Sequence, residues 1–168
     1  MKKMNLNEWA AAGEIVGTVA VVISLLFVAY SVDRNTDATQ ASNENILFER
    51  HTDLANQFLL DPALAELLLK KRNGDDGLSE VEAIRWEKYE LGMLDIWALA
   101  HSRYERDLLS EEQWVAWDRY FSHIFSKGAE SISRERWEHL QYGYETSFWN
   151  HVGAELFETE LDKQGRGL

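Results

Sequence analysis

The sequence predicts an all-α fold: one N-terminal transmembrane helix that extends into a stalk, followed by a helical bundle of about four further helices. Three observations predict it. Residues Ile15 to Val32 contain no Asp, Glu, Lys, Arg or His. The 168 residues include a single proline, Pro62, so little interrupts the helices. After residue 60, bulky apolar side chains recur three or four positions apart, as on the buried face of a helix.

The expected organisation is an anchor at residues 1–32, a helical stalk at 33–60 and an acidic, aromatic-rich helical domain at 61–168. Charge follows this division. Lys2 and Lys3 balance the two acidic residues of the anchor, so the whole net charge of −12 belongs to residues 33–168. Such a surface repels nucleic acid and anionic lipid headgroups, so we expect this part of the chain to bind neither.

The anchor is predicted from its length and its flanks. The 18 residues from Ile15 to Val32 span about 27 Å as a helix, close to the roughly 30 Å hydrocarbon core of a bilayer. Trp9 and Tyr30 lie near the two ends, where amphipathic rings are enriched at membrane interfaces. This part of the chain is therefore expected to contact membrane lipid.

Two alternatives to an anchor are an unusually hydrophobic core helix and a cleaved signal peptide. A core helix rarely continues for so many residues without a charged face. For a signal peptide, Lys2 and Lys3 supply the basic start and Ala29-Tyr30-Ser31 is a small-x-small cleavage pattern. The apolar run nevertheless exceeds the roughly 7–15 residues of an ordinary signal core, which favours the anchor.

Small residues form a strip along one side of the anchor. Gly13 and Gly17 are four residues apart, and Ala20 and Ser24 continue the strip on roughly the same face. Such strips let a second transmembrane helix approach closely, so these residues are a candidate helix-packing face. Beside them, Glu14 is either a carboxylate at headgroup level near the positive helix end or a partner for a cation or another subunit.

The predicted stalk contains neither glycine nor proline. Its apolar residues recur at roughly heptad intervals and comprise Ile46, Leu47, Leu54, Phe58 and Leu59. Residues 33–45 are almost wholly polar, so this part of the stalk either bridges solvent or pairs with another chain.

Local patterns place the borders of the next helix. Asp61 followed by Pro62 fits an N-cap with proline at the first helical position, which opens a helix to about Lys71. The sequence NGDDG then predicts a loop.

Capping boxes open the two helices that follow. Ser79-x-x-Glu82 begins a helix to about Arg106, and Ser110-x-x-Gln113 begins another. Gly128 is expected just past the end of the second of these helices. Ser133 is the predicted cap of a last long segment, in which Gly143 and Gly153 are candidate interruptions. The tail DKQGRGL is expected to be frayed.

Both helices opened by capping boxes carry rows of aromatic side chains. At helical spacing such rows are typical of a core. They are also the candidate lining of an aromatic pocket for a lipid, quinone or pigment, and the candidate pocket residues are Trp86, Tyr89, Trp97, Trp114, Trp117 and Phe121.

The sequence contains few residues arranged for catalysis or metal binding. None of the five histidines has an acidic residue three positions before it, as a di-iron bundle requires. There is no cysteine. A calcium loop in RNGDDGLSEVEA would place Arg72 and Ala83 where carboxylates are needed. We therefore expect no enzymatic activity, no cofactor and no metal.

Residues 9–36 resemble a widespread group of uncharacterised small bacterial membrane proteins. The shared features are a Trp, a Glu-Ile pair, a Val-rich span with Ser-Leu, an aromatic residue and an Asn-Thr exit, here Trp9, Glu14-Ile15, Val21 to Leu25, Tyr30 and Asn35-Thr36. The resemblance implies a single-span protein of the bacterial inner membrane with an aromatic-rich helical domain, and implies no activity. Members of this group often carry basic residues after the Asn-Thr pair, whereas this chain has Asp37 and Gln40.

This departure bears on orientation. Lys2, Lys3 and the terminal amine precede the anchor, and Arg34 stands alone near its exit. The positive-inside rule then favours a cytoplasmic N-terminus and a periplasmic domain by a margin of one or two charges.

The expected function is that of a non-enzymatic, membrane-anchored structural or accessory subunit. It would assemble with itself or dock onto a larger membrane complex of respiratory, photosynthetic or transport type. The alternative is a membrane-anchored binding or sensor module for a hydrophobic ligand, held in the aromatic pocket.

Overall fold

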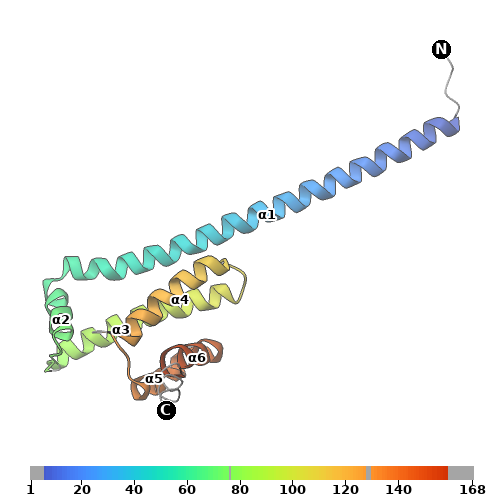
Figure 1. The fold of residues 1–168 in the computed structure, drawn as a ribbon. Helices are drawn as coiled ribbons and strands as arrows, with labels where there is room; N and C mark the ends of the chain where they lie inside the picture. Colours follow the sequence, from blue (N-terminus) through green and yellow to red (C-terminus); the bar gives the residue numbers. More distant parts are fainter. Residues whose placement is uncertain (1–5, 76, 128–129, 159–168) are drawn as a thin grey trace. The chain divides into compact units, whose positions relative to one another are not determined.

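A computed structural model describes residues 6–75, 77–127 and 130–158, and over these residues the chain is helical without strands (Figure 1). The all-α prediction is confirmed. In chain order the elements are α1 (Leu6–Leu60), α2 (Pro62–Arg72), α3 (Glu80–Tyr104), α4 (Glu111–Ser126), α5 (Arg134–Leu140), the 3₁₀ turn η1 (Gln141–Gly143), α6 (Thr146–Gly153) and the π-helical turn η2 (Ala154–Glu158).

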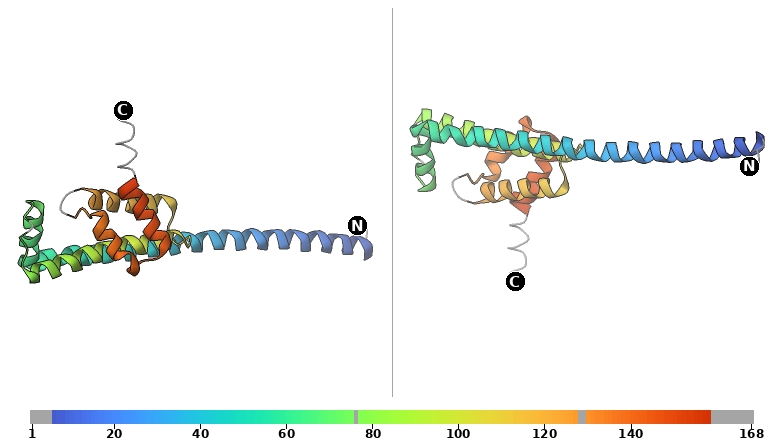
Figure 2. Two further views of the ribbon diagram at one scale, coloured as in Figure 1. Left: turned by 90° about the horizontal axis from the view of Figure 1, so that it is seen from below. Right: turned by 90° about the horizontal axis from the view of Figure 1, so that it is seen from above.

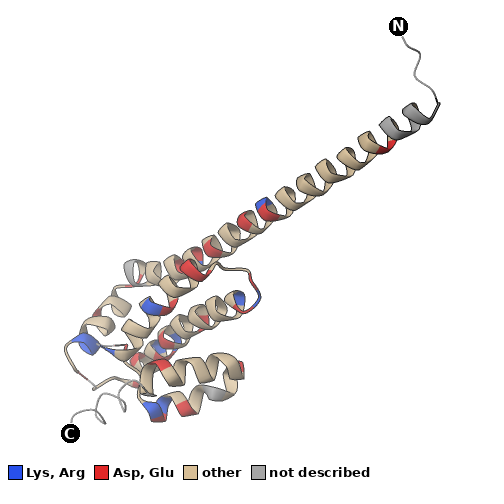
Figure 3. Ribbon diagram, turned by 45° about the vertical axis from the view of Figure 1, so that its right-hand side comes forward, with Lys and Arg blue, Asp and Glu red and all other residues tan. Residues whose placement is uncertain are grey.

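The chain divides into two compact units, one ending at Thr39 and the other beginning at Gln40. The first consists of the leading part of α1. Among the described residues, α1 is the helix long and apolar enough to cross a membrane, and its most apolar stretch is wholly unburied. Figure 3 shows the long run of turns in α1 without an acidic or basic residue.

Two hydroxyl groups in the apolar part of α1 form hydrogen bonds within the helix itself. Thr18 donates to the carbonyl of Glu14 at 2.9 Å, and Ser24 donates to the carbonyl of Ala20 at 2.8 Å. A hydroxyl that bonds back to its own helix needs no water, so these two residues are compatible with an apolar surrounding.

The N-termini of the helices in the second unit follow the predicted caps. Asp61 accepts a hydrogen bond from the backbone of Ala63 at 3.0 Å. Ser79 and Ser110 each form the reciprocal capping box, with Glu82 and Gln113 as the third helical residues. These three borders are confirmed.

The C-terminal ends of α2 and α3 are each followed by a residue in the left-handed conformation. Gly74 has φ +73°, and its N–H and that of Asp75 bond back to the carbonyls of Lys71 and Lys70. Asp107 has φ 58°, and its N–H and that of the next residue close the end of α3 in the same way. Both ends are Schellman motifs, which satisfy carbonyls that the helix leaves open.

The last segment is broken where Gly143 predicted an interruption. α5 is capped by Ser133, whose Oγ accepts from the backbone of Arg136 at 3.1 Å, and it gives way to η1, which ends at Gly143. At Gly153 the α-helical part also ends, since α6 stops at that residue and the chain continues directly as the π-helical turn η2. The predictions at Gly128 and over the tail at 162–168 lie outside the described residues.

The core of the second unit forms around α3 and α4, which pack against each other and are joined by the six-residue connection 105–110. α6 packs against α3 (Figure 2). α1 contributes from Gln40 onward: Leu47 is fully buried, and Leu54 packs so closely on Gly92 that a Cβ there would lie 3.2 Å from its side chain. The structure therefore divides the predicted stalk, because the residues from Gln40 help to form the domain.

Candidate functional site

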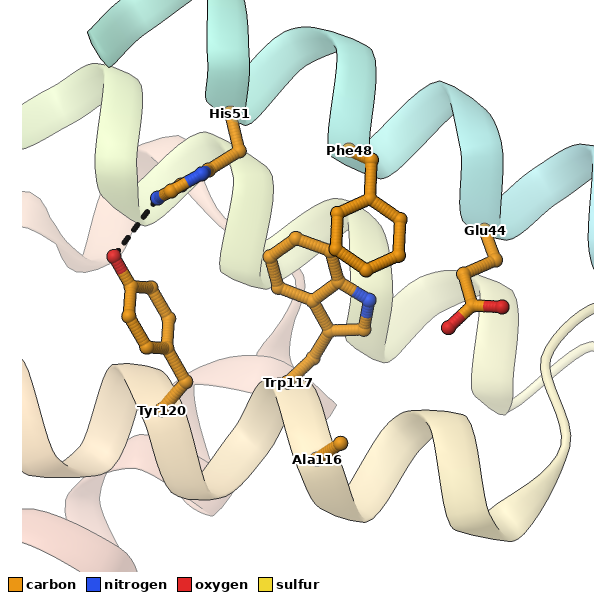
Figure 4. A pocket seen from close by; sticks show the side chains of 6 residues that line it. All are labelled: Glu44, Phe48, His51, Ala116, Trp117 and Tyr120. Atoms are coloured by element: carbon orange, nitrogen blue, oxygen red, sulfur yellow. Dashed lines mark hydrogen bonds between the residues drawn. The ribbon is translucent and has the colours of Figure 1, made fainter.

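A groove of about 250 Å³ lies between α1 and α4 within the second unit. Its lining, shown in Figure 4, comprises Glu44, Phe48, His51, Ala116, Trp117 and Tyr120. The three α1 residues are four and three positions apart and so share one face of that helix. The same spacing rule places Tyr120 beside Trp117 on α4.

Aromatic rings make up most of this lining. Trp117 is only 6% exposed, whereas Phe48 is 53% and Tyr120 is 40% exposed. The ring centroids of Phe48 and Trp117 are 5.0 Å apart with planes tilted by 53°, and the His51 and Tyr120 rings meet edge to face at 5.3 Å. Trp117 therefore forms a fixed floor between more accessible rings.

The polar groups of the groove lie toward its two ends in Figure 4. At one end, Glu44 Oε2 accepts a hydrogen bond of 2.6 Å from Gln113 Nε2, which fixes the carboxylate. At the other, His51 Nε2 and the Tyr120 hydroxyl lie 2.8 Å apart. Burial lowers the pKa of His51 and raises the pKa of Tyr120, so both side chains are neutral near pH 7. The Glu44 carboxylate therefore carries the formal charge among the lining residues.

A second polar cluster lies inside the aromatic core. Asp118 Oδ1 accepts from Trp97 Nε1 at 2.9 Å and pairs with His151 Nε2 at 2.6 Å. The hydrogen bond to Asp118 raises the pKa of His151, whereas burial lowers the pKa of His101, whose ring centroid is 5.3 Å from that of His151. Asp118 therefore joins α3, α4 and α6, and it gives a partner to the buried indole N–H of Trp97 and to the partly buried ring of His151.

Sequence reasoning did not find this cluster. Helical spacing places Glu155 one turn from His151, whereas the hydrogen bond is to Asp118, 33 residues away. Among the described residues no group of three His, Asp or Glu side chains is placed to hold a metal ion.

The six predicted pocket residues separate into two places. Four lie in the core: the Trp97 and Trp117 rings each stack on Phe121, at 5.9 and 5.8 Å, and Trp114 stacks on Tyr104 at 5.3 Å. The remaining pair, Trp86 and Tyr89, contact each other at 5.4 Å elsewhere on α3.

Trp117 and Trp86 line separate grooves. Trp117 lines the groove of Figure 4. Trp86 lines a different groove of about 360 Å³, where the Lys71 ammonium lies 5.7 Å from its ring centroid. Whether the six residues form a pocket that binds a ligand stays a prediction.

Sequence reasoning missed Glu44, Phe48, His51 and Tyr120 as groove residues. The sequence predicts a stalk for the three α1 residues, and an apolar repeat does not show which surface of the domain such a helix covers. The available indication was that Phe48 and His51 lie between the heptad positions Leu47, which is buried, and Leu54, which is partly buried.

The predicted helix-packing residues all lie exposed on α1: Gly13, Glu14, Gly17, Ala20 and Ser24. A Cβ built at Gly13 or Gly17 would meet no atom within 4 Å, so the strip has room for a neighbouring helix. Its use for packing stays a prediction.

Comparison with protein-family models, with curated proteins and with solved structures finds no match for this chain.

Proposed function

We propose that the chain is a single-span protein of the bacterial inner membrane whose acidic helical domain is a non-enzymatic structural or accessory module. The observation that carries the proposal is the exposure of the apolar part of α1. Twelve large apolar side chains between Ile15 and Val32 are at least half exposed. At about 1.5–3 kcal/mol for burying each of them, water contact would cost on the order of 20 kcal/mol, which a bilayer removes.

The titratable groups of the domain support a structural role. Strongly shifted pKa values often mark catalytic sites, but here they arise from caps and core packing. Hydrogen bonds from Lys70 and Ser79 lower the pKa of Glu82 to about 2. Burial raises the pKa of Tyr89 to about 12. These groups stabilise helix starts and helix packing.

Association is proposed to use the small-residue strip of α1. Glycines four residues apart let a second helix approach to backbone distance, where van der Waals contact exceeds what lipid offers. The partner is either a second copy of this chain or a helix of a larger respiratory, photosynthetic or transport complex.

The strip is tested by changing Gly13→Leu and Gly17→Leu together. We expect the assembly in mild detergent to fall to a smaller size, measured by native electrophoresis, because two isobutyl groups would hold the neighbouring helix away. Ile15→Leu with Val22→Leu, on the opposite face, is the matched control and should change nothing. An unchanged assembly size in the glycine variant would contradict packing through this strip.

The accessory role itself is tested by solubilising native membranes in mild detergent and separating complexes by size. Co-migration with a larger complex supports an accessory subunit, and migration as a small multiple of 19.5 kDa supports self-assembly. Recovery of the chain as a monomer in both membranes and detergent would contradict both forms of the proposal.

A second candidate function is ligand binding, and the groove of Figure 4 is the observation that favours it. It differs from the predicted aromatic pocket in its residues, since it uses α1 and shares only Trp117 with the predicted set.

A further inference from the structure

The groove between α1 and α4 combines ring faces with one fixed carboxylate. Phe48 and Tyr120 present partly exposed rings on either side of Trp117. The faces of such rings carry negative potential and attract a cation within about 6 Å. An apolar ligand body also gains from contact with the same surfaces, because they are removed from water.

The helix segments around the groove carry negative charge, as the carboxylate inside it does. Glu44 supplies the carboxylate, and a carboxylate that already accepts from Gln113 keeps lone pairs for further donors. No lysine or arginine lines the groove. Over residues 40–57 and 111–126, the two helix segments around it carry six acidic residues against two basic ones. A cation is therefore attracted on approach as well as on contact.

The size of the groove limits the ligand. About 250 Å³ is slightly below the range of drug-sized pockets, so a single ring or a short chain with one charged group fits. An anion would meet the Glu44 carboxylate at one end, and the neutral His51 and Tyr120 pair supplies no compensating positive charge at the other.

We propose that this groove binds a small organic cation, an ammonium group carried on an aromatic or short aliphatic body. The ammonium lies against Glu44, and the body lies along Phe48, Trp117 and Tyr120. This inference rests on the second candidate function and is independent of the accessory role.

The test uses the full chain in a non-ionic maltoside detergent, with phenethylammonium as the probe. Phenethyl alcohol is the neutral match, and phenylacetate is the anionic one. Binding is followed through the indole N–H resonances of the seven tryptophans, with that of Trp117 identified by its loss in Trp117→Phe. We expect a saturable shift of the Trp117 resonance with phenethylammonium, about tenfold weaker binding of the alcohol, and no saturable shift with phenylacetate.

Two variants locate the site. Glu44→Gln removes the charge while keeping the shape and is expected to weaken phenethylammonium binding about tenfold. Phe48→Leu keeps an apolar contact but removes a ring, and about threefold weaker binding is expected. Glu49→Gln is the charge-matched control on an exposed position of the same helix and should leave binding unchanged.

Equal affinity for the ammonium and the alcohol would overturn the cation proposal while leaving a hydrophobic-ligand module standing. A Trp117 resonance unmoved by any probe would overturn both. A Trp117 shift that depends on protein concentration and disappears in Phe48→Leu would assign the groove to a second copy of the chain, and would also overturn the proposal.

Discussion

Asp118 is the residue at which the polar contacts of the aromatic core converge. It accepts from Trp97 and pairs with His151, and so connects three helices through one carboxylate. Buried groups left without such a partner cost about 1–3 kcal/mol each, so this residue matters more to stability than an exposed acid does.

Asp118→Asn is expected to lower the free energy of unfolding by about 1–3 kcal/mol, since the amide oxygen can still accept from Trp97 but the charge opposite His151 is lost. The pKa of His151 should fall from its raised value, because its first cause is the hydrogen bond to Asp118. Chemical denaturation and a histidine NMR titration measure the two effects. Glu112→Gln, an exposed acid on the same helix, is the control, and an unmoved His151 would contradict the assignment.

The two core histidines respond to pH in opposite directions. The pKa of His151 is raised on folding, so its stabilisation is complete below its unfolded value of 6.5 and is lost as pH rises through the folded pKa. The pKa of His101 is lowered, so stability falls as pH drops below 6.5 and the unfolded state takes up a proton there first. In Asp118→Asn the alkaline loss should disappear while the acid-side loss remains.

Histidine spacing in the sequence could not reveal this pair. A sequence shows neighbours within a turn of helix, and His151 with Glu155 is such a neighbour. Asp118 reaches His151 only because α4 and α6 are packed together, which is a property of the tertiary fold.

Helix ends show how far local chemistry determines structure. The caps at Asp61, Ser79 and Ser110 were predictable because each cap is complete within four residues of sequence. The left-handed end at Asp107 was not, since most helix ends of this kind carry glycine and aspartate gives no comparable indication.

The two Schellman ends give a paired prediction. Asp107→Gly is expected to stabilise the protein by roughly 0.5–1 kcal/mol, because glycine adopts positive φ without the Cβ penalty. Gly74→Ala imposes that penalty at the equivalent position of α2 and is expected to destabilise by about 1 kcal/mol.

Thermal unfolding of the two variants beside the parent measures both effects. Gly153→Ala, which lies in α6 with open space around its Cβ, is the control for glycine replacement without positive φ. Destabilisation by Asp107→Gly would contradict this prediction and would show that the aspartate side chain itself stabilises this helix end.

For whole helices, α1 shows what could not be predicted: which part of the helix packs onto the domain. The heptad positions Leu47 and Leu54 were recognised as apolar, but a repeating apolar stripe does not say which surface it covers. The close approach of Leu54 to Gly92 shows the surface, and it depends on a glycine 38 positions further along the chain. The groove lined by Glu44 and Phe48 could not be foreseen without that contact.

For the molecule as a whole, the sequence predicted the fold class because composition and periodicity act over many residues at once. An 18-residue stretch without Asp, Glu, Lys, Arg or His and the rows of aromatic side chains determine where apolar surface lies. Association depends on partners, and so the role of the exposed strip at Gly13 and Gly17 remains a proposal.

We propose that residues 15–32 lie within a bilayer, and the absence of native cysteine allows a direct test of this placement. Ser24→Cys places a thiol in the middle of the stretch, and Ser42→Cys places one at an exposed polar position. Native membranes opened to expose both faces are treated with a charged maleimide. We expect rapid labelling of Ser42→Cys and labelling of Ser24→Cys only after denaturation in detergent. Equally fast labelling of both variants in intact bilayers would contradict this placement.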